Sequence, residues 1–123
     1  MSQVIPKITV QSKKLVLDNE KLRRANAKVT TATAYKKGDL LTLSDTNVLA
    51  HATDEKAWDV ICGQDVSAAE ATIKAADGIE IPVYYGGVFN VEAVSLNGTL
   101  LTTAQYDAAR AQATKNKIEL SKV

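Results

Sequence analysis

The sequence predicts a mainly β domain of the α+β class, a small antiparallel unit with one short C-terminal helix and an extended N-terminal arm. Three observations indicate this fold. The middle of the chain is rich in β-branched and aromatic residues, which favour strands. Three dipeptides typical of hairpin turns punctuate it, namely Asp77-Gly78, Gly86-Gly87 and Asn97-Gly98. At 123 residues the chain allows one compact domain, and we expect one core.

The first 27 residues are expected to form the arm, and residues 28–123 the β-rich domain. Residues 4–10 are β-prone, but Pro6 has no backbone N–H and restricts the segment to a sheet edge or an isolated extended stretch. Residues 15–27 show no sustained helical or strand period, so we expect irregular structure there.

The charge distribution is uneven although the net charge is only +1. Residues 1–37 hold nine basic and two acidic side chains, whereas residues 38–123 hold six basic and twelve acidic ones. A basic leader on an acidic body indicates an arm that approaches a negatively charged partner, and a solvated tail is the alternative. The N-terminus lacks the pattern of a secretory signal, and no apolar run is long enough for a spanning helix, so we expect a protein made in a cytoplasm without membrane contact.

The first strands of the domain are expected on either side of a basic turn. Residues 29–35 and 40–43 are rich in strand formers, and Lys36-Lys37-Gly38-Asp39 between them is turn-like. A third strand is expected over residues 58–66, with Gly63 as a possible bulge.

Residues 79–96 have the most informative pattern, because apolar side chains occupy both faces of the expected strands. We expect a hairpin that turns at Gly86-Gly87. With a single core to cover one face, the second face is expected to be buried by another molecule. The chain therefore has the pattern of a subunit in an assembly.

The C-terminal part predicts the helix and a closing strand. Thr102 and Gln105 have the spacing of a capping box, an alanine-rich helix follows, and residues 118–120 alternate like a strand.

Residues that could carry enzymatic chemistry are sparse. His51 has no second imidazole or thiol near it in the sequence, and Cys62 lies among apolar residues, as expected for a buried, reduced thiol. The glycine pair lies between strands and does not have the setting of a phosphate-binding loop. Basic residues lack interleaved aromatics for base stacking. We therefore expect no catalytic residue, no metal, no cofactor and no nucleic-acid contact.

The aromatic side chains have two possible roles. Core packing is the default for such rings, but Tyr and Trp are also enriched in interfaces. We expect about one ring in three to contact another subunit. The candidates for this subunit interface are Trp58, Tyr84, Tyr85 and Phe89.

The ordered set of motifs resembles the lambda-type bacteriophage head decoration proteins, which stabilise capsids. The similarity is clearest over residues 81–90, Ile-Pro-Val-Tyr-Tyr-Gly-Gly-Val-Phe-Asn. The basic turn at residues 36–41, the apolar segment 60–66, the helix with Arg110 and the closing segment 118–120 are similar to family features in the same order. The resemblance covers roughly residues 28–123, and residues 1–27 are longer and more basic than a plain arm.

This resemblance implies a head decoration fold and a structural protein of the virion. It implies homotrimers on the outer surface of the mature, expanded head at threefold positions, with N-terminal arms adding strands to the major capsid protein. The residues expected to form this capsid-binding arm are Val4, Ile5, Lys7, Ile8, Val10, Lys13 and Lys14. Alternatives are another virion surface protein of the head-fibre type, or a small β-barrel enzyme or ligand carrier.

Overall fold

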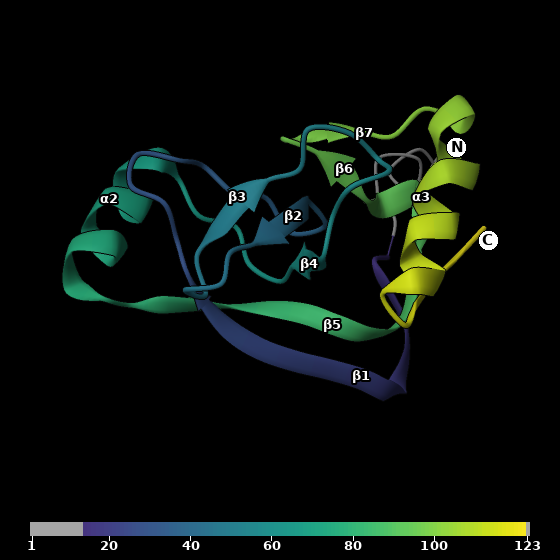
Figure 1. The fold of residues 1–123 in the computed structure, drawn as a ribbon, viewed down its shortest axis with the longest axis horizontal. Helices are drawn as coiled ribbons and strands as arrows, with labels where there is room; N and C mark the ends of the chain where they lie inside the picture. Colours follow the sequence, from purple (N-terminus) through teal and green to yellow (C-terminus); the bar gives the residue numbers. More distant parts are fainter. Residues whose placement is uncertain (1–13, 123) are drawn as a thin grey trace, which may run out of the picture.

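The computed structural model describes residues 14–122, which form one mainly β unit with a helix near each end (Figure 1). The main sheet has six strands in the order β1-β5-β4-β2-β3, and β8 also pairs with β5. The strands are β1 (Val16–Lys28), β2 (Leu40–Leu43), β3 (Leu49–His51), β4 (Val60–Cys62), β5 (Glu80–Asn90), β6 (Ser95–Leu96), β7 (Thr99–Leu100) and β8 (Ile118–Ser121). The helices are α2 (Ala68–Asp77), the short 3-10 turn η1 (Val91–Ala93) and α3 (Thr103–Lys115). A mainly β fold with antiparallel pairing is confirmed, although the β5–β8 pair is parallel.

Strand β5 is continuous, so the expected hairpin at Gly86-Gly87 is wrong. Its pairing with β1 runs through the glycine pair instead of turning there. A Cβ on Gly86 would lie 3.1 Å from the Arg23 side chain, and one on Gly87 would lie 3.2 Å from Leu22, so the two glycines let β1 approach closely. They serve strand packing and not a turn.

The two faces of the sheet are buried by two separate clusters within the same chain. Leu40, Ile61 and Tyr84 occupy paired positions on one face and belong to the larger cluster. Leu41 pairs with Val60 on the opposite face, in the second cluster. The expectations of a single core, and of a second molecule needed to cover one face, are therefore corrected. The reason is that α3 with the β6–β7 ribbon packs on one side, while the 29–35 loop and α2 pack on the other.

Strand β1 replaces the irregular segment expected over residues 15–27. It pairs with β5 from Val16 to Lys28, with register shifts between Val16 and Arg24. Only Ala27 in this strand is fully enclosed, and most of its side chains are exposed. A strand with so few buried positions has no apolar alternation, which is why its period was not evident. Strand β1 also runs across residue 27, where the sequence placed the boundary between arm and domain.

The described residues form helix α2 as well as the C-terminal helix α3, so the expectation of a single helix is wrong. Helix α2 begins with a capping box in which Ser67 Oγ accepts from Glu70 N and Glu70 Oε1 accepts from Ser67 N. Its end is Gly78 at φ +69°, a left-handed cap, whereas Asp77-Gly78 was expected to turn a hairpin.

The C-terminal expectations are confirmed. Helix α3 spans Thr103–Lys115, with Gln105 Oε1 accepting from the Thr102 N–H at 2.8 Å. Strand β8 follows at Ile118–Ser121. The β6–β7 ribbon turns at Asn97-Gly98, where both residues have positive φ as a tight hairpin requires.

The segments before β5 follow the expectation in part. Residues 40–43 form a strand as expected, but residues 29–35 are a loop. Hydrogen bonds from Thr30 Oγ1 and Tyr35 OH to the Leu49 carbonyl tie this loop to β3, and Tyr35 pairs with Val66 through an isolated bridge. The strand expected over residues 58–66 is limited to β4.

Candidate protein-binding site

The expected capsid-binding arm falls almost wholly outside the described residues. Val4, Ile5, Lys7, Ile8, Val10 and Lys13 belong to the undescribed segment, and Lys14 is the first described residue, with an exposed side chain. The candidate site among the described residues is therefore the surface next to Lys14.

Asp39 organises that surface although its side chain is almost fully buried. Its Oδ1 accepts hydrogen bonds from Ser95 Oγ and from the Gly98 N–H at 2.9 Å, and its Oδ2 accepts from the Lys36 N–H at 2.9 Å. One carboxylate thus fixes the turn before β2 to the β6–β7 ribbon. These donors replace the hydrogen bonds to water that the buried carboxylate loses, and so offset the free energy of its desolvation.

The turn at residues 36–39 is held by further contacts that leave its lysine side chains free. The Lys37 N–H donates to Asp65 Oδ1 at 2.8 Å, and the Gly38 N–H donates to the Cys62 carbonyl at 2.9 Å. Gly38 has φ +101°, and a Cβ there would lie 2.5 Å from the Ala93 carbonyl oxygen. Only glycine fits this position. The backbone of the turn is fixed while the Lys36 and Lys37 side chains are exposed.

A groove of about 540 Å³ lies between this turn, the start of β1 and the β6–β7 ribbon. We call it the lysine groove, and its lining residues are Lys14, Leu15, Val16, Lys36, Lys37, Asp65, Glu92, Ala93 and Leu100. Leu100 is 53% exposed, one of the few large apolar side chains left open to solvent. No described ion pair engages the three lysines. The groove therefore offers positive charge beside an apolar wall.

Sequence reasoning identified the lysine turn as a family-like motif but did not assign it to a site. The signal for it was present in the adjacent lysines followed by Gly38 and Asp39. Leu100 carried no such signal, because its position in the groove depends on the hydrogen bonds from Gly98 and Ser95 to Asp39.

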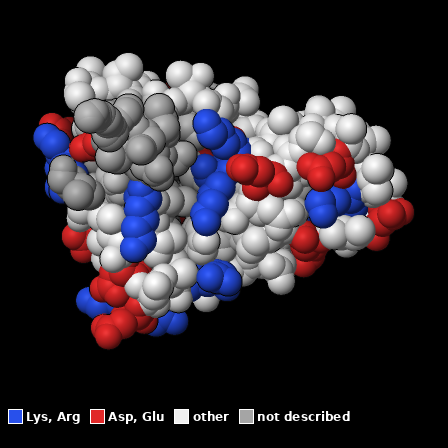
Figure 2. Space-filling model, turned by 180° about the vertical axis from the view of Figure 1, so that it is seen from behind, with Lys and Arg blue, Asp and Glu red and all other residues white. Residues whose placement is uncertain are grey.

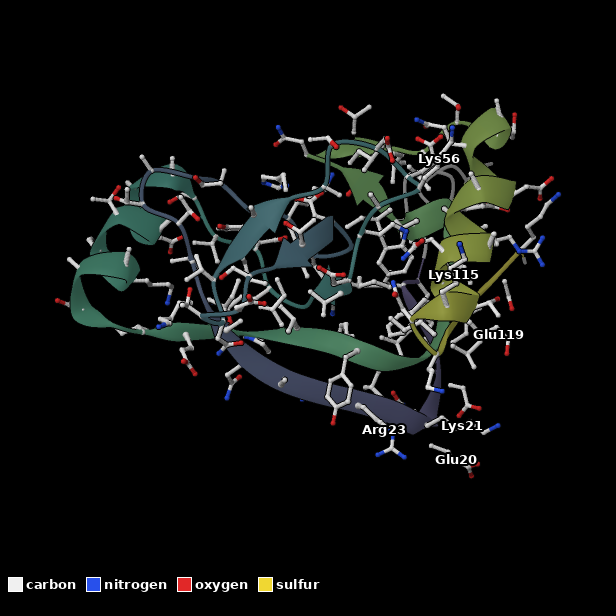
Figure 3. The ribbon with its side chains drawn as sticks, in the orientation of Figure 1. Glu20, Lys21, Arg23, Lys56, Lys115 and Glu119 are labelled. Atoms are coloured by element: carbon white, nitrogen blue, oxygen red, sulfur yellow. The ribbon has the colours of Figure 1, made fainter. Side chains whose placement is uncertain are left out.

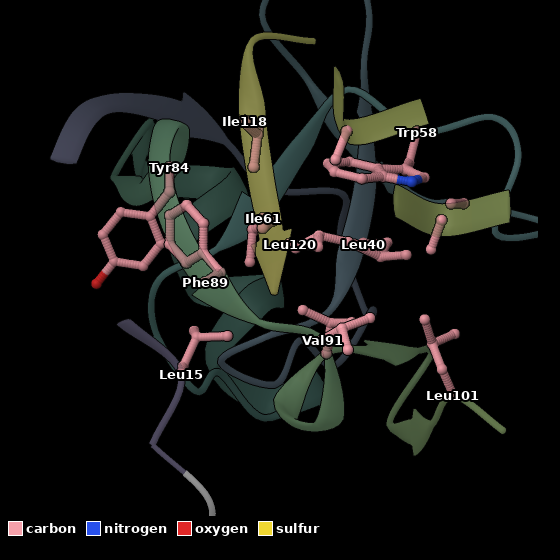
Figure 4. Packing of buried hydrophobic residues seen from close by; sticks show 14 residues of the cluster. Leu15, Leu40, Trp58, Ile61, Tyr84, Phe89, Val91, Leu101, Ile118 and Leu120 are labelled. Carbon is pink, nitrogen blue, oxygen red and sulfur yellow. The ribbon is translucent and has the colours of Figure 1, made fainter. Parts of the chain in front are cut away.

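Three of the four candidate interface rings lie in the core. Trp58, Tyr84 and Phe89 are 1%, 5% and 0% exposed, and they pack in the larger cluster (Figure 4). Tyr84 and Phe89 pack ring against ring, with centroids 5.3 Å apart. The assignment of these three rings to a subunit interface is corrected, since their own chain already encloses them. Tyr85 is 46% exposed and keeps surface for a contact.

His51 lies at the end of β3 and stacks on Tyr35 with ring centroids 5.1 Å apart. Its Nε2 donates to the Ala34 carbonyl at 2.7 Å, since a carbonyl can only accept. Its Nδ1 lies 3.8 Å from Asp39 Oδ2. Because these contacts hold the loop before the lysine turn, the structure gives His51 a structural role.

Cys62 is a buried free thiol that donates to the Gln64 carbonyl. Burial raises the pKa of Cys62 to about 11, and the nearby carboxylates of Asp39 and Asp65 act in the same direction. The neutral thiol is therefore the form present at neutral pH, and a neutral thiol is a poor nucleophile.

A second groove, of about 1020 Å³, lies where β1 and β5 meet α3 and β8. Its lining includes Glu20, Lys21 and Arg23 from β1 and Glu119 from β8 (Figure 3). Arg110 Nη1 lies 3.9 Å from Asp107 Oδ1 there, and Arg110 Nε donates to the Leu120 carbonyl. Four basic side chains (Lys21, Arg23, Arg110 and Lys117) and three acidic ones (Glu20, Asp107 and Glu119) line this groove, so it also has a small excess of positive charge.

Among residues 14–122 no group of three His, Cys, Asp or Glu side chains is placed to hold a metal ion. No helix in the same range has the length and hydropathy that crossing a membrane requires.

Comparison with known proteins returned no match, either to a protein-family model or to a curated protein.

Proposed function

We propose that this protein is a bacteriophage capsid decoration protein that binds the outside of the mature, expanded head as trimers at threefold positions. Its N-terminal residues 4–10 would pair as an added strand with the major capsid protein. By binding the assembled shell and not its separate subunits, the trimer would stabilise the head against the pressure of the packaged genome.

The observation that carries this proposal is the position of Lys14 beside the lysine groove. Lys14, the first described residue, lines the lysine groove, and the sequence directly before it is β-prone and basic. A strand added from residues 4–10 would therefore leave the body next to a positively charged surface. Three such arms on one trimer would bind about 10² to 10⁴ times more tightly than one arm, if their spacing matches the lattice.

The basic side chains also support an electrostatic approach to an acidic shell. Figure 2 shows lysine and arginine side chains near the middle of one broad face, with acidic side chains beside them and toward the ends. The basic side chains there would attract an oppositely charged surface, and salt would weaken the effect.

The test is co-sedimentation with emptied, expanded heads of the phage whose genome carries this coding sequence. We expect the full chain to sediment with the heads, and a chain lacking residues 1–13 to stay in the supernatant. Cryo-electron microscopy of the decorated heads should show density at the threefold positions. Density elsewhere would favour a head-fibre type of protein, and binding that survives removal of residues 1–13 would contradict strand addition.

A further inference from the structure

We infer that the lysine groove binds an extended acidic segment of a partner protein, with its carboxylates at Lys36 and Lys37 and an apolar side chain against Leu100. The lining of the groove supports the binding of such a segment, whatever protein carries it. The assignment of the segment to the major capsid protein rests on the proposed function.

The charge of the groove is the first support. Lys14, Lys36 and Lys37 bring three ammonium groups to one groove, against the carboxylates of Asp65 and Glu92. Asp65 is already engaged, because its Oδ1 accepts from the Lys37 N–H. Lysine is a mobile point charge that accepts carboxylates in many geometries, which suits a flexible acidic peptide.

The rigidity of the groove is the second support. Asp39 fixes the lysine turn to the β6–β7 ribbon, and Gly38 packs against the Ala93 carbonyl. Lys36 and Leu100 are thus presented on backbones that the core holds in place. A preformed site loses less entropy on binding than one that must be ordered first.

The apolar wall selects a peptide over a nucleic acid. Leu100 is 53% exposed and Ala93 lines the groove beside it, which offers contact to an aliphatic side chain. No aromatic ring among the described residues lines the groove, so bases would find no stacking partner in this part of the chain.

An extended segment can present both kinds of side chain that the groove would bind. Extended chain rises about 3.3 Å per residue and alternates its side chains between two sides. A segment with acidic residues on one side and an apolar residue on the other would meet the lysines and Leu100 together. This pattern is the recognition element that we expect in the partner.

The decisive experiment titrates the full chain with the peptide acetyl-Glu-Glu-Leu-Glu-Glu-amide and follows binding by NMR. We expect shifts of the Leu100 methyl and Ala93 signals, with affinity that falls as salt rises. The variant Lys36→Glu with Lys37→Glu should bind about tenfold more weakly, because each change replaces an attraction by a repulsion. Both side chains are exposed and their hydrogen bonds come from backbone N–H groups, so the variant should fold.

The matched control is Lys56→Glu with Lys115→Glu, which makes the same change of charge at two exposed lysines outside the groove (Figure 3). It should bind the peptide within about twofold of the unaltered chain. The peptide in which serine replaces leucine should bind the unaltered chain more weakly, and Leu100→Asn should remove that difference. Equal weakening in both lysine variants would overturn the groove, since the effect would then follow from overall charge.

Two outcomes separate this inference from the proposed function. If the peptide binds at Leu100 but the phage heads bind no protein, the groove stands and the decoration role fails. If the heads bind the Lys36→Glu, Lys37→Glu variant as well as the unaltered chain and the peptide causes no shifts, the groove fails and the decoration role stands. Tighter binding of hexathymidylate than of the peptide would overturn the peptide assignment in favour of nucleic acid.

Discussion

The carboxylate of Asp39 accepts the hydroxyl hydrogen bond of Ser95, a contact between residues 56 positions apart that joins the turn before β2 to the β6–β7 ribbon. Both side chains are 1% exposed. The same carboxylate also accepts from the N–H groups of Lys36 and Gly98. The position of the lysine groove therefore depends on one buried acidic residue.

Replacing Asp39 by Asn should lower the free energy of unfolding by about 1 to 3 kcal/mol. The amide NH₂ would face the N–H of Lys36 or the donors of Ser95 and Gly98, so at least one donor loses its acceptor. Urea denaturation measures the loss. Asp45→Asn, at an exposed turn, is the control and should change stability by less than about 0.5 kcal/mol. Equal midpoints for the two variants would contradict the role of Asp39.

Two aromatic variants separate core packing from surface contact. Phe89→Ala should cost about 3 to 5 kcal/mol, because the ring is fully buried in the larger cluster. Tyr85→Ala should cost much less, since that ring is 46% exposed. Urea melts measure both, and sedimentation velocity then shows whether Tyr85→Ala weakens the proposed self-association. A Phe89→Ala protein as stable as the parent would refute the packing.

Two truncations test whether β1 is needed for folding. Removing residues 1–13 keeps the residues of every described strand and helix in the chain, so this protein should fold, as circular dichroism would show. Removing residues 1–27 deletes nearly all of β1 and exposes one edge of β5, so this chain should be strongly destabilised or fail to fold. A stable, fully folded protein beginning at Lys28 would show that β1 is dispensable.

Cys62 should react with a thiol reagent only when the chain unfolds. Because burial raises its pKa from 9.0 to about 11, the folded thiol stays protonated while the unfolded thiol ionises. Its contribution to stability is complete below pH 9 and is lost as the pH rises from 9 to 11. Dithionitrobenzoate labelling at pH 8, with and without urea, tests the protection, and Cys62→Ala should flatten the alkaline decline. Rapid labelling of the folded chain would show that the thiol is open.

The parts of the fold that sequence predicted are those with local signals. The capping residues of α3, the alternation in β8 and the Asn97-Gly98 turn each act over a few neighbouring residues. The same kind of signal was present for α2, where Ser67 and Glu70 form a capping box. It was not recognised because Asp77-Gly78 matches a hairpin turn as well as a helix end.

The parts that were not predicted depend on contacts between distant segments. Gly86-Gly87 has the composition of a turn, but the approach of Leu22 and Arg23 from β1 makes it part of a strand. In the same way, the lysine turn becomes the wall of a groove only through the link from Asp39 to Gly98. The spacing of residues along the chain does not show that Leu22 packs on Gly87, or that Gly98 donates to Asp39.

The sharing of β5 between the two clusters couples their unfolding. Ile81 and Val83 belong to one cluster, and Tyr84 and Phe89 belong to the other, on a single continuous strand. Because both clusters pack against this strand, loss of one cluster removes support from the other. The two clusters should therefore unfold together, with one melting transition in calorimetry.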